Sequence, residues 1–447
     1  MTLRFDAVLR ELIAWLKINL QALPPDGRVV AVRDIRGQVR LIVESADLGT
    51  WNSEKETEIS QRLGAYRAAG DFLIQVGTEN GFDDFFNAPE AFSSAELPER
   101  IKILDRLITG REWLYPVGEK SNHPPRFVFF GLKGGVGRST ALSMVAWHLA
   151  QQGKKVLVID LDLESPGLGN MLLPVRQDLR EDGDTALPGW PDYGMTDWFV
   201  EDAVGQANEA LLNQMIQPSP IEGSGQGEII VVPAAGGLYD QNYVSKLSRS
   251  YADLPNAQGK IEVFGDRLTR AISQIENHVQ PDVVLLDSRA GIHHISATAL
   301  TRLDARVYLF ASDSEQTWAG FNALFSHWAL KTETIRQIRG SLRLVSALTP
   351  FGSEKKTFRD AYGEHSFDTF VRLYDDGSNP ASGDDLFSFG VFEDDAPHRP
   401  VLVWQDSTYL NFSPLTKTVQ LDTEKAQLVF EELFTRIDRD LNNKESS

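Results

Sequence analysis

The sequence has 447 residues, of which 42% are hydrophobic and 24% are charged, a balance typical of a globular protein with two or three domains. It contains no cysteine, which excludes structural disulfides, thiolate zinc sites, cysteine-ligated iron–sulfur clusters and cysteine nucleophiles. The formal net charge is -19, so the surface should repel nucleic acid and anionic lipid unless basic residues gather on one face, and no run of Lys or Arg indicates such a patch.

Residues 1–120 are predicted to form a small α+β domain. The chain begins with an amphipathic helix whose apolar positions are Phe5, Leu9, Leu12, Ile13 and Leu16, and whose acidic residues argue against a signal peptide. Two strand-like runs follow, RVVAVRD and GQVRLIVES, and helices are predicted around 54–69 and 97–109. The segment YPVGEKSNHPP, rich in proline and polar residues, is the best candidate for a linker.

From Arg126 onward, patterns of buried strands alternate with helical patterns. RFVFFG is a continuous apolar run, and similar runs recur in KKVLVIDLD, GEIIVVPAAGG, PDVVLLDSRAG, DARVYLFAS and LRLVSALTP. Helices are predicted around 139–152, 195–216, 261–278, 294–302 and 315–330. The alternation predicts an α/β domain over residues 121–350, with a doubly wound, mainly parallel sheet.

Residues 351–447 are predicted to complete or flank that α/β domain. RPVLVWQ is a candidate late strand, and YDDGSNPASGDD is a loop by composition. The stretch TEKAQLVFEELFTRIDRDL predicts a terminal helix. Its candidate core residues are Leu428, Phe430, Leu433, Phe434, Ile437 and Leu441.

The stretch GLKGGVGRST, residues 131–140, joins the first apolar run of the α/β domain to the helix that follows. A strand, a glycine-rich turn and a helix N-terminus together form a site for anions, because backbone N–H groups and the helix dipole face the ligand. Gly134, Gly135 and Gly137 allow the backbone to approach phosphate oxygens closely. The alternatives are a plain turn or a dinucleotide site. The usual phosphate loop, G-x-x-x-x-G-K-[ST], is matched poorly, because Leu132 and Arg138 replace its first glycine and its lysine.

The pattern K-G-G-x-G-K-[ST], which has an additional lysine at its start, fits the stretch better. The segment resembles the deviant Walker A loop of the ParA/MinD family of P-loop ATPases (SIMIBI class). The resemblance implies that Lys133 is the signature lysine, which reaches across an ATP-sandwiched dimer to the partner's nucleotide. It also implies that ATP is held by Gly134, Gly135, Val136, Gly137, Arg138, Ser139 and Thr140.

Two further motifs carry the same resemblance, which covers about residues 126–350. VIDLD matches an Asp-x-Asp at a strand end, which implies that Asp160 acts on Mg²⁺ and that Asp162 positions the attacking water. VVLLDSRAGI is close to the switch D-[ST]-P-A-G-I, which implies that Asp287 is the Walker B acid and that Gly291 approaches the γ-phosphate. Arg289 stands where the family has proline, which leaves the shape of the switch open. The resemblance also implies that the hydroxyl of Ser139 binds Mg²⁺ together with Asp160 and Asp287.

Arg138 is expected to take over part of the missing lysine's work. A guanidinium is permanently charged and can contact phosphate through two parallel hydrogen bonds, but it is longer and planar. We therefore expect ATP binding to be retained more fully than the rate of hydrolysis. The expected catalytic residues are Lys133, Arg138 and Asp162.

Several neighbouring residues have simpler interpretations. Glu164 and Asn170 are interpreted as parts of loop structure, and Ser312 or Ser314 as a helix cap. His293 and His294 are expected at a helix start, since adjacent histidines rarely bind one metal ion. Core packing is the default interpretation of the tryptophans at 318 and 328.

The predicted function is that of a Mg²⁺-dependent, ATP-hydrolysing switch in the cytoplasm, with slow turnover. As the resemblance implies, it dimerises around ATP; its N- or C-terminal additions are expected to bind a protein partner, with a bacterial multi-gene system such as defence as one context. No apolar stretch approaches the roughly 18 residues of a membrane span. The acidic residues of the predicted C-terminal helix, Glu431, Glu432, Asp438 and Asp440, also argue against membrane docking, so no membrane contact is expected. One alternative is an ATP-sensing scaffold with little or no hydrolysis. The other is a DNA-partition ATPase, which the acidic total disfavours without excluding.

Overall fold

The computed structural model describes residues 3–445 except 24, 26, 46–50, 77–80, 89, 108–109, 115–121, 175–188, 222–226, 238–241, 256–258, 260, 330–331, 352–353 and 376–385. The chain divides into two compact units. Unit 1 comprises Met1–Pro116 and Leu330–Thr334, and unit 2 comprises Val117–Ala329 and Ile335–Ser447. The candidate linker 115–125 falls at this division and lies largely outside the described residues.

Unit 1 is a five-stranded sheet with helices packed on it. The strand order is β3-β2-β1-β5-β4, where β1 (Arg28–Arg33) pairs antiparallel with β2 (Val39–Glu44) and parallel with β5 (Ile101–Asp105). The outer strands are β3 (Leu73–Val76) and β4 (Ala91–Ser93). Helices α1 (Phe5–Ile18) and α2 (Ser53–Leu63) contribute to one apolar cluster, and α3 (Phe82–Phe86) to a second. The predicted α+β character of the N-terminal region is confirmed.

Two details of unit 1 differ from the sequence-based expectation. The helix predicted around 97–109 is wrong, because residues Ile101–Asp105 form β5 in the interior of the sheet. A five-residue apolar run does not distinguish a buried strand from a helix by periodicity. Phe5 was expected to face the core, but its side chain is 48% exposed and lies against Gly37 and under the guanidinium of Arg33.

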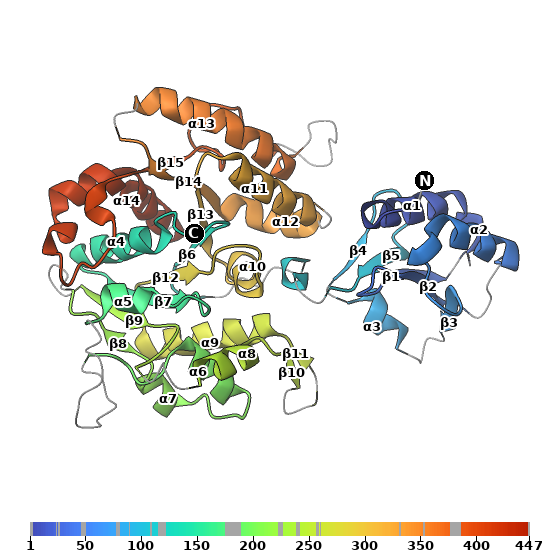
Figure 1. Cartoon of the computed structure of the whole chain (residues 1–447), viewed down its shortest axis with the longest axis horizontal. Helices are drawn as coiled ribbons and strands as arrows, with labels where there is room; N and C mark the ends of the chain where they lie inside the picture. Colours follow the sequence, from blue (N-terminus) through green and yellow to red (C-terminus); the bar gives the residue numbers. More distant parts are fainter. Residues whose placement is uncertain are drawn as a thin grey trace. The chain divides into compact units, whose positions relative to one another are not determined.

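Unit 2 is built on an eight-stranded sheet, and it confirms the predicted doubly wound α/β fold (Figure 1). The strand order is β15-β14-β13-β6-β12-β7-β9-β8, and every neighbouring pair is parallel except β8 with β9. The strands are β6 (Arg126–Gly131), β7 (Lys155–Leu161), β8 (Gln217–Pro218), β9 (Glu228–Val232), β12 (Val283–Ser288), β13 (Arg306–Ala311), β14 (Leu342–Thr349) and β15 (Val401–Trp404). A short antiparallel pair, β10 (Leu254–Pro255) and β11 (Ile261–Glu262), lies outside this sheet.

Helices cover both faces of the large sheet, so its central strands are buried on both sides. On one face, α4 (Arg138–Gln151) packs against α14 (Thr423–Glu445), and α14 also contacts β15. On the other face, α10 (His294–Thr301) contacts β6, β12 and α9 (Phe264–Val279). The remaining helices of unit 2 are α5 (Leu168–Leu172), α6 (Met195–Asp202), α7 (Glu209–Asn213), α8 (Tyr243–Ser250), α11 (Glu315–Trp328) and α13 (Lys355–Phe370). Helix α12 (Thr332–Ile338) has residues in both units.

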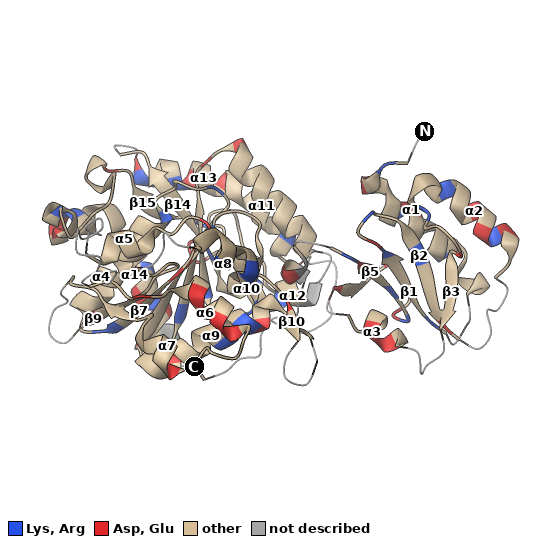
Figure 2. Ribbon diagram, turned by 60° about the horizontal axis from the view of Figure 1, so that its bottom comes forward, with Lys and Arg blue, Asp and Glu red and all other residues tan. Residues whose placement is uncertain are grey.

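The C-terminal segment adds an edge strand and a covering helix to the large sheet. β15 extends the sheet beside β14, and α14 buries Phe430, Leu433, Phe434, Ile437 and Leu441 as predicted. Leu428 was also expected in the core, but its side chain is 56% exposed, since it lies on the outer face of α14. The helix predicted over 195–216 is two helices, α6 and α7. Acidic and basic positions are interspersed on the ribbons of both units (Figure 2).

Candidate functional site

The glycine-rich segment forms the turn between β6 and α4, as expected. Gly135 and Gly137 have φ angles of 75° and 76°, a region that a side chain with a Cβ rarely adopts. Gly137 caps α4, which begins at Arg138. A Cβ placed on Gly134 or Gly135 would meet no atom within 4 Å, so the turn faces open space. The backbone therefore offers a concave approach to an anion at the N-terminus of α4.

Parallel pairing brings the two acidic strand ends beside this turn. β12 lies between β6 and β7, and in its register Asp287 is opposite both Phe129 of β6 and Asp160 of β7. Ligands of open α/β sheets bind at the carboxyl ends of the strands. Residues separated by more than a hundred positions in the sequence thus meet at one edge of the sheet.

Arg138 lies among these carboxylates. Its side chain is 9% exposed, Nε donates to Asp287 Oδ1 at 2.6 Å, and Nη2 is 3.4 Å from Asp162 Oδ2. Burial disfavours the charged guanidinium, yet Asp287 and Asp162 together hold the pKa of Arg138 above its ordinary value. The sequence predicted a phosphate contact for Arg138; in this structure its guanidinium faces the two acids.

Asp160 is fully buried and receives three backbone hydrogen bonds. The donors are the N–H groups of Asp162 at 3.0 Å, Gly167 at 3.2 Å and Leu168 at 3.1 Å. Burial and the charge of Asp287 nevertheless raise the pKa of Asp160 to about 7. Burial also raises the pKa of Asp162, although Arg138 opposes that shift. The carboxyl groups of Asp160, Asp162 and Asp287 therefore repel one another when charged, and a cation among them reduces this repulsion.

The predicted switch begins at the end of β12 and is tied to the start of the loop. Gly291 has a φ of 87°, and its N–H donates to the carbonyl of Gly131 at 2.9 Å. Glycine is needed here because an L-residue at this φ would be strained. The contact holds the switch backbone next to the glycine-rich turn.

Sequence reasoning missed the role of Glu164. Its carboxylate accepts a hydrogen bond from Nη1 of Arg289 at 2.6 Å and another from the hydroxyl of Tyr251 at 2.6 Å, and His293 Nε2 is 3.4 Å away. Burial and this hydrogen bond raise the pKa of Tyr251 above its ordinary value. Glu164 thus ties the loop after β7 to the switch. The available signal was Arg289 itself, because an arginine in place of proline beside an acidic site is a candidate for an ion pair; its side chain is 30% exposed.

The other residues predicted for the site lie on the same turn. Lys133 is exposed, and no ion pair of this lysine is found among the described residues. Val136 is buried in the core beneath the turn. Ser139 and Thr140 are half-buried in the first turn of α4, where the carbonyl of Ser139 accepts a hydrogen bond from Ser143 Oγ. The predicted cap is confirmed for Ser314, whose side chain accepts from the N–H of Thr317.

A pair of aromatic side chains near the turn had no counterpart in the sequence-based interpretation. Leu348, at the end of β14, has a φ of 57°, and its side chain lies 3.7 Å from where a Cβ of Gly137 would be. Phe351 and Trp404 follow at the ends of β14 and β15, with ring centroids 6.0 Å apart. Phe351 is 60% exposed, whereas Trp404 is half-buried against the core, so the ring of Phe351 is the one available to stack on a planar group.

The residues present fit a Mg²⁺ ion bound together with phosphates. Among the described residues, no three His, Asp or Glu side chains are arranged to hold a metal ion by themselves. Mg²⁺ does not require such a cage, because it commonly keeps several waters and is bound by one or two protein oxygens plus substrate phosphates. The carboxyl groups of Asp160 and Asp287, with the hydroxyl of Ser139 at the start of α4, match this set of oxygen ligands.

Comparisons with known proteins agree with these motifs. A family model described as an AAA domain matches residues 127–168, from β6 to the start of α5. A curated protein named as a replication protein A of Sinorhizobium fredii is 26% identical over 170 residues, which cover 38% of this chain and 35% of that protein. A cytosolic Fe-S cluster assembly factor NUBP2 homolog of Nematostella vectensis is 38% identical over 96 residues, covering 19% of this chain and 36% of that protein.

One solved structure is a ParA family ATPase from Chlorobium tepidum TLS. It is 15% identical, covers 66% of this chain and 91% of its own, and has a TM-score of 0.39. The chain spans about a third of the length of the two curated relatives. The family-model match covers the strand, glycine-rich turn and helix at the start of the nucleotide site and the strand β7 with its acidic end, and the sheet that carries them is mainly parallel. No helix in the described part of the chain combines the length and apolar character that crossing a bilayer requires.

Proposed function

We propose that this chain, a ParA/MinD-like P-loop ATPase, binds ATP with Mg²⁺ and hydrolyses it slowly as a molecular switch. The observation that carries the proposal is the convergence of the glycine-rich turn with the ends of β7 and β12, where Asp160 and Asp287 are opposite one another. A single strand–turn–helix is common, but a turn joined to two buried acidic strand ends offers both the backbone donors and the Mg²⁺-binding acids that phosphoryl transfer uses.

Each residue has a part in this function. The turn and the N-terminus of α4 donate backbone hydrogen bonds to the phosphates, with Val136 as the buried anchor of the turn. Ser139, Asp160 and Asp287 would hold Mg²⁺, which neutralises phosphate charge when bound. Asp162, 16% exposed at the strand end, would accept a hydrogen bond from the attacking water and orient it.

In this proposal, Arg138 contacts both the carboxylate of Asp287 and the phosphates of ATP. Its guanidinium contacts Asp287 through Nε, which leaves Nη donors for phosphate oxygens. Lys133 lies exposed on the same turn, as a residue must to reach a second copy of the chain. The ATP-dependent dimer is proposed on that exposure together with the family resemblance.

We also propose that the chain controls a protein partner. Unit 1 is a separate compact unit, and it contains none of the nucleotide-site motifs. Its surface is therefore the candidate for binding a protein partner. The acidic total of 63 against 44 basic residues disfavours DNA as that partner.

One observation favours the alternative of an ATP-sensing scaffold. Arg138 Nη2 lies 3.4 Å from Asp162, the residue assigned to the attacking water. If that pair persists with ATP bound, it competes with water for Asp162 Oδ2, so hydrolysis would be slower while binding is retained. The two functions therefore share a site and differ in turnover.

ATP binding is tested with two matched glycine variants in unit 2. Gly135 in the turn and Gly153 after α4 both have a positive φ, 75° and 82°, and neither would place a Cβ within 4 Å of another atom. Gly135→Val should reduce Mg²⁺-ATP affinity at least about tenfold by isothermal titration calorimetry, whereas Gly153→Val carries the same backbone strain and should leave it unchanged. Equal affinity in all three proteins would count against the site.

A further inference from the structure

A second charged cavity lies in unit 2 at the edge of the sheet, away from the glycine-rich turn. It has a volume of about 400 Å³ and is bounded by α13, α14, β14 and the segment that enters β15. Its lining includes six Lys or Arg residues against three Asp or Glu, in a chain where acidic residues outnumber basic ones. The six are Arg343, Lys355, Arg359, Arg399, Arg436 and Arg439.

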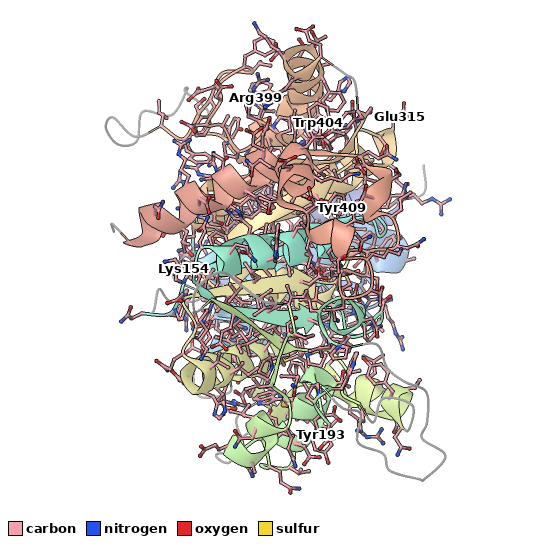
Figure 3. The ribbon with its side chains drawn as sticks, turned by 90° about the vertical axis from the view of Figure 1, so that its left-hand side faces the viewer. Lys154, Tyr193, Glu315, Arg399, Trp404 and Tyr409 are labelled. Atoms are coloured by element: carbon pink, nitrogen blue, oxygen red, sulfur yellow. The ribbon has the colours of Figure 1, made fainter. Side chains whose placement is uncertain are left out.

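Three of the arginines in its walls are largely buried. Arg399 is 7% exposed, and Arg343 and Arg436 are each 14% exposed. Figure 3 shows Arg399 above α14, on the side of α13. Buried guanidinium groups are costly unless anions and hydrogen-bond acceptors match them.

The acceptors present do not match these groups fully. Nε of Arg343 and Nε of Arg399 make no hydrogen bond among the described residues; their nearest carboxylate oxygens, on Asp440 and Asp394, are 3.7 and 3.6 Å away. Burial, with the charges of Arg436 and Arg306, lowers the pKa of Arg343 to about 10. Two buried guanidinium donors beside the cavity are therefore unsatisfied among the described residues.

Each of these cations also has a carboxylate nearby. Arg399 Nη2 donates to Asp360 Oδ1 at 2.5 Å. Arg439 Nη1 donates to Asp395 Oδ1 at 2.7 Å, and Arg436 Nε is 3.3 Å from Asp440 Oδ2. Glu432 alone accepts from both Lys355 Nζ at 2.6 Å and Arg359 Nη2 at 2.5 Å. Asp394 is 86% exposed. The pair of Arg439 with Asp395, whose side chains are 56% and 60% exposed, contributes little to stability.

We infer that this cavity binds a small polyanion carrying at least two phosphate groups. Arginine side chains on separate elements can each take a phosphate through paired hydrogen bonds. The volume lies in the range of organic ligand sites, and Ala396, Pro400 and Val401 supply apolar contact beside the cations. The occupant would bridge α13, α14 and β15, which meet at the cavity.

The test uses the full chain with its ATP site saturated by Mg²⁺ and a non-hydrolysable ATP analogue. Inorganic pyrophosphate and fructose 1,6-bisphosphate are titrated separately by calorimetry. Arg399→Gln should weaken binding of the tighter probe about tenfold or more, and Lys355→Gln, whose side chain is 49% exposed, several-fold. Lys425→Gln removes one charge from α14 outside the cavity and should change nothing. Because Lys355 is half-exposed at the opening of the cavity, Lys355→Gln should fold, and it tests the inference even if Arg399→Gln does not fold.

Tighter binding of fructose 1,6-bisphosphate supports an organic ligand, and tighter binding of pyrophosphate supports an inorganic one. The inference is overturned if neither probe binds, or if Arg399→Gln and Lys355→Gln bind both probes as tightly as the wild type and the Lys425→Gln control do. It is also overturned if duplex DNA, and neither probe, binds more weakly to the Lys355→Gln and Arg399→Gln variants than to the wild type.

Discussion

Replacing Arg138 by methionine tests the electrostatics of the candidate site most strongly. The guanidinium is 9% exposed and is bonded to Asp287, which is 2% exposed. Methionine retains much of the length but removes the charge, so Asp160, Asp162 and Asp287 are left together without a cation. Breaking a buried ion pair by removing one partner costs about 3–5 kcal/mol. Arg138→Lys keeps the charge but loses the Nε bond, and should cost about 1–2 kcal/mol.

The assay is hydrogen exchange of peptides from α4 and β12, read by mass spectrometry, which reports opening at the site itself. Lys155→Met is the control, because it breaks an ion pair in the same unit whose partners, Lys155 and Glu228, are 36% and 46% exposed; its cost should stay below about 1 kcal/mol. Adding Asp287→Asn to Arg138→Met should restore part of the lost protection. Protection in Arg138→Met equal to that of the control would refute the assignment of Arg138 as the counter-ion.

Two further predictions concern the dimer and the pH dependence of stability. Lys133→Ala should abolish an ATP-induced dimer in light scattering while ATP affinity changes by less than about an order of magnitude, and a dimer retained in this variant would contradict the trans-acting role. His398 accepts a hydrogen bond from the Tyr374 hydroxyl at its Nδ1, and burial lowers its pKa below the ordinary 6.5. The folded chain then binds fewer protons than the unfolded chain near that pH, so stability should fall as the pH drops below about 6.5, and His398→Gln should flatten the melting-temperature profile between pH 8 and 5. Parallel profiles in the two proteins would exclude His398 as the cause.

Much of unit 2 could be predicted because parallel strands buried on both faces appear as continuous apolar runs. RFVFFG, KVLVIDL and VVLLDS are β6, β7 and β12, and the acids at their ends follow from the same runs. β5 was misassigned because a short apolar run such as IKILD has no distinctive period.

Contacts between distant segments could not be predicted in the same way. Glu164 meets Arg289 across 125 positions and Tyr251 across 87, and neither spacing leaves a local pattern. The basic cavity likewise draws its arginines from β14, α13, α14 and the segment before β15, so no run of basic residues announces it. The direction of Arg138 depends on the register of β7 and β12, which sequence alone does not fix.

Phosphate release from ATP by the wild type and by Asp162→Ala tests the central proposal of a hydrolysing switch most directly. With Mg²⁺, the wild type should release phosphate slowly, and Asp162→Ala should release it at least about tenfold more slowly while binding ATP equally well. Asp84→Ala, an exposed carboxylate of α3 in unit 1, is the control and should match the wild type. Equal turnover in the wild type and Asp162→Ala, or none in either, would contradict the proposal.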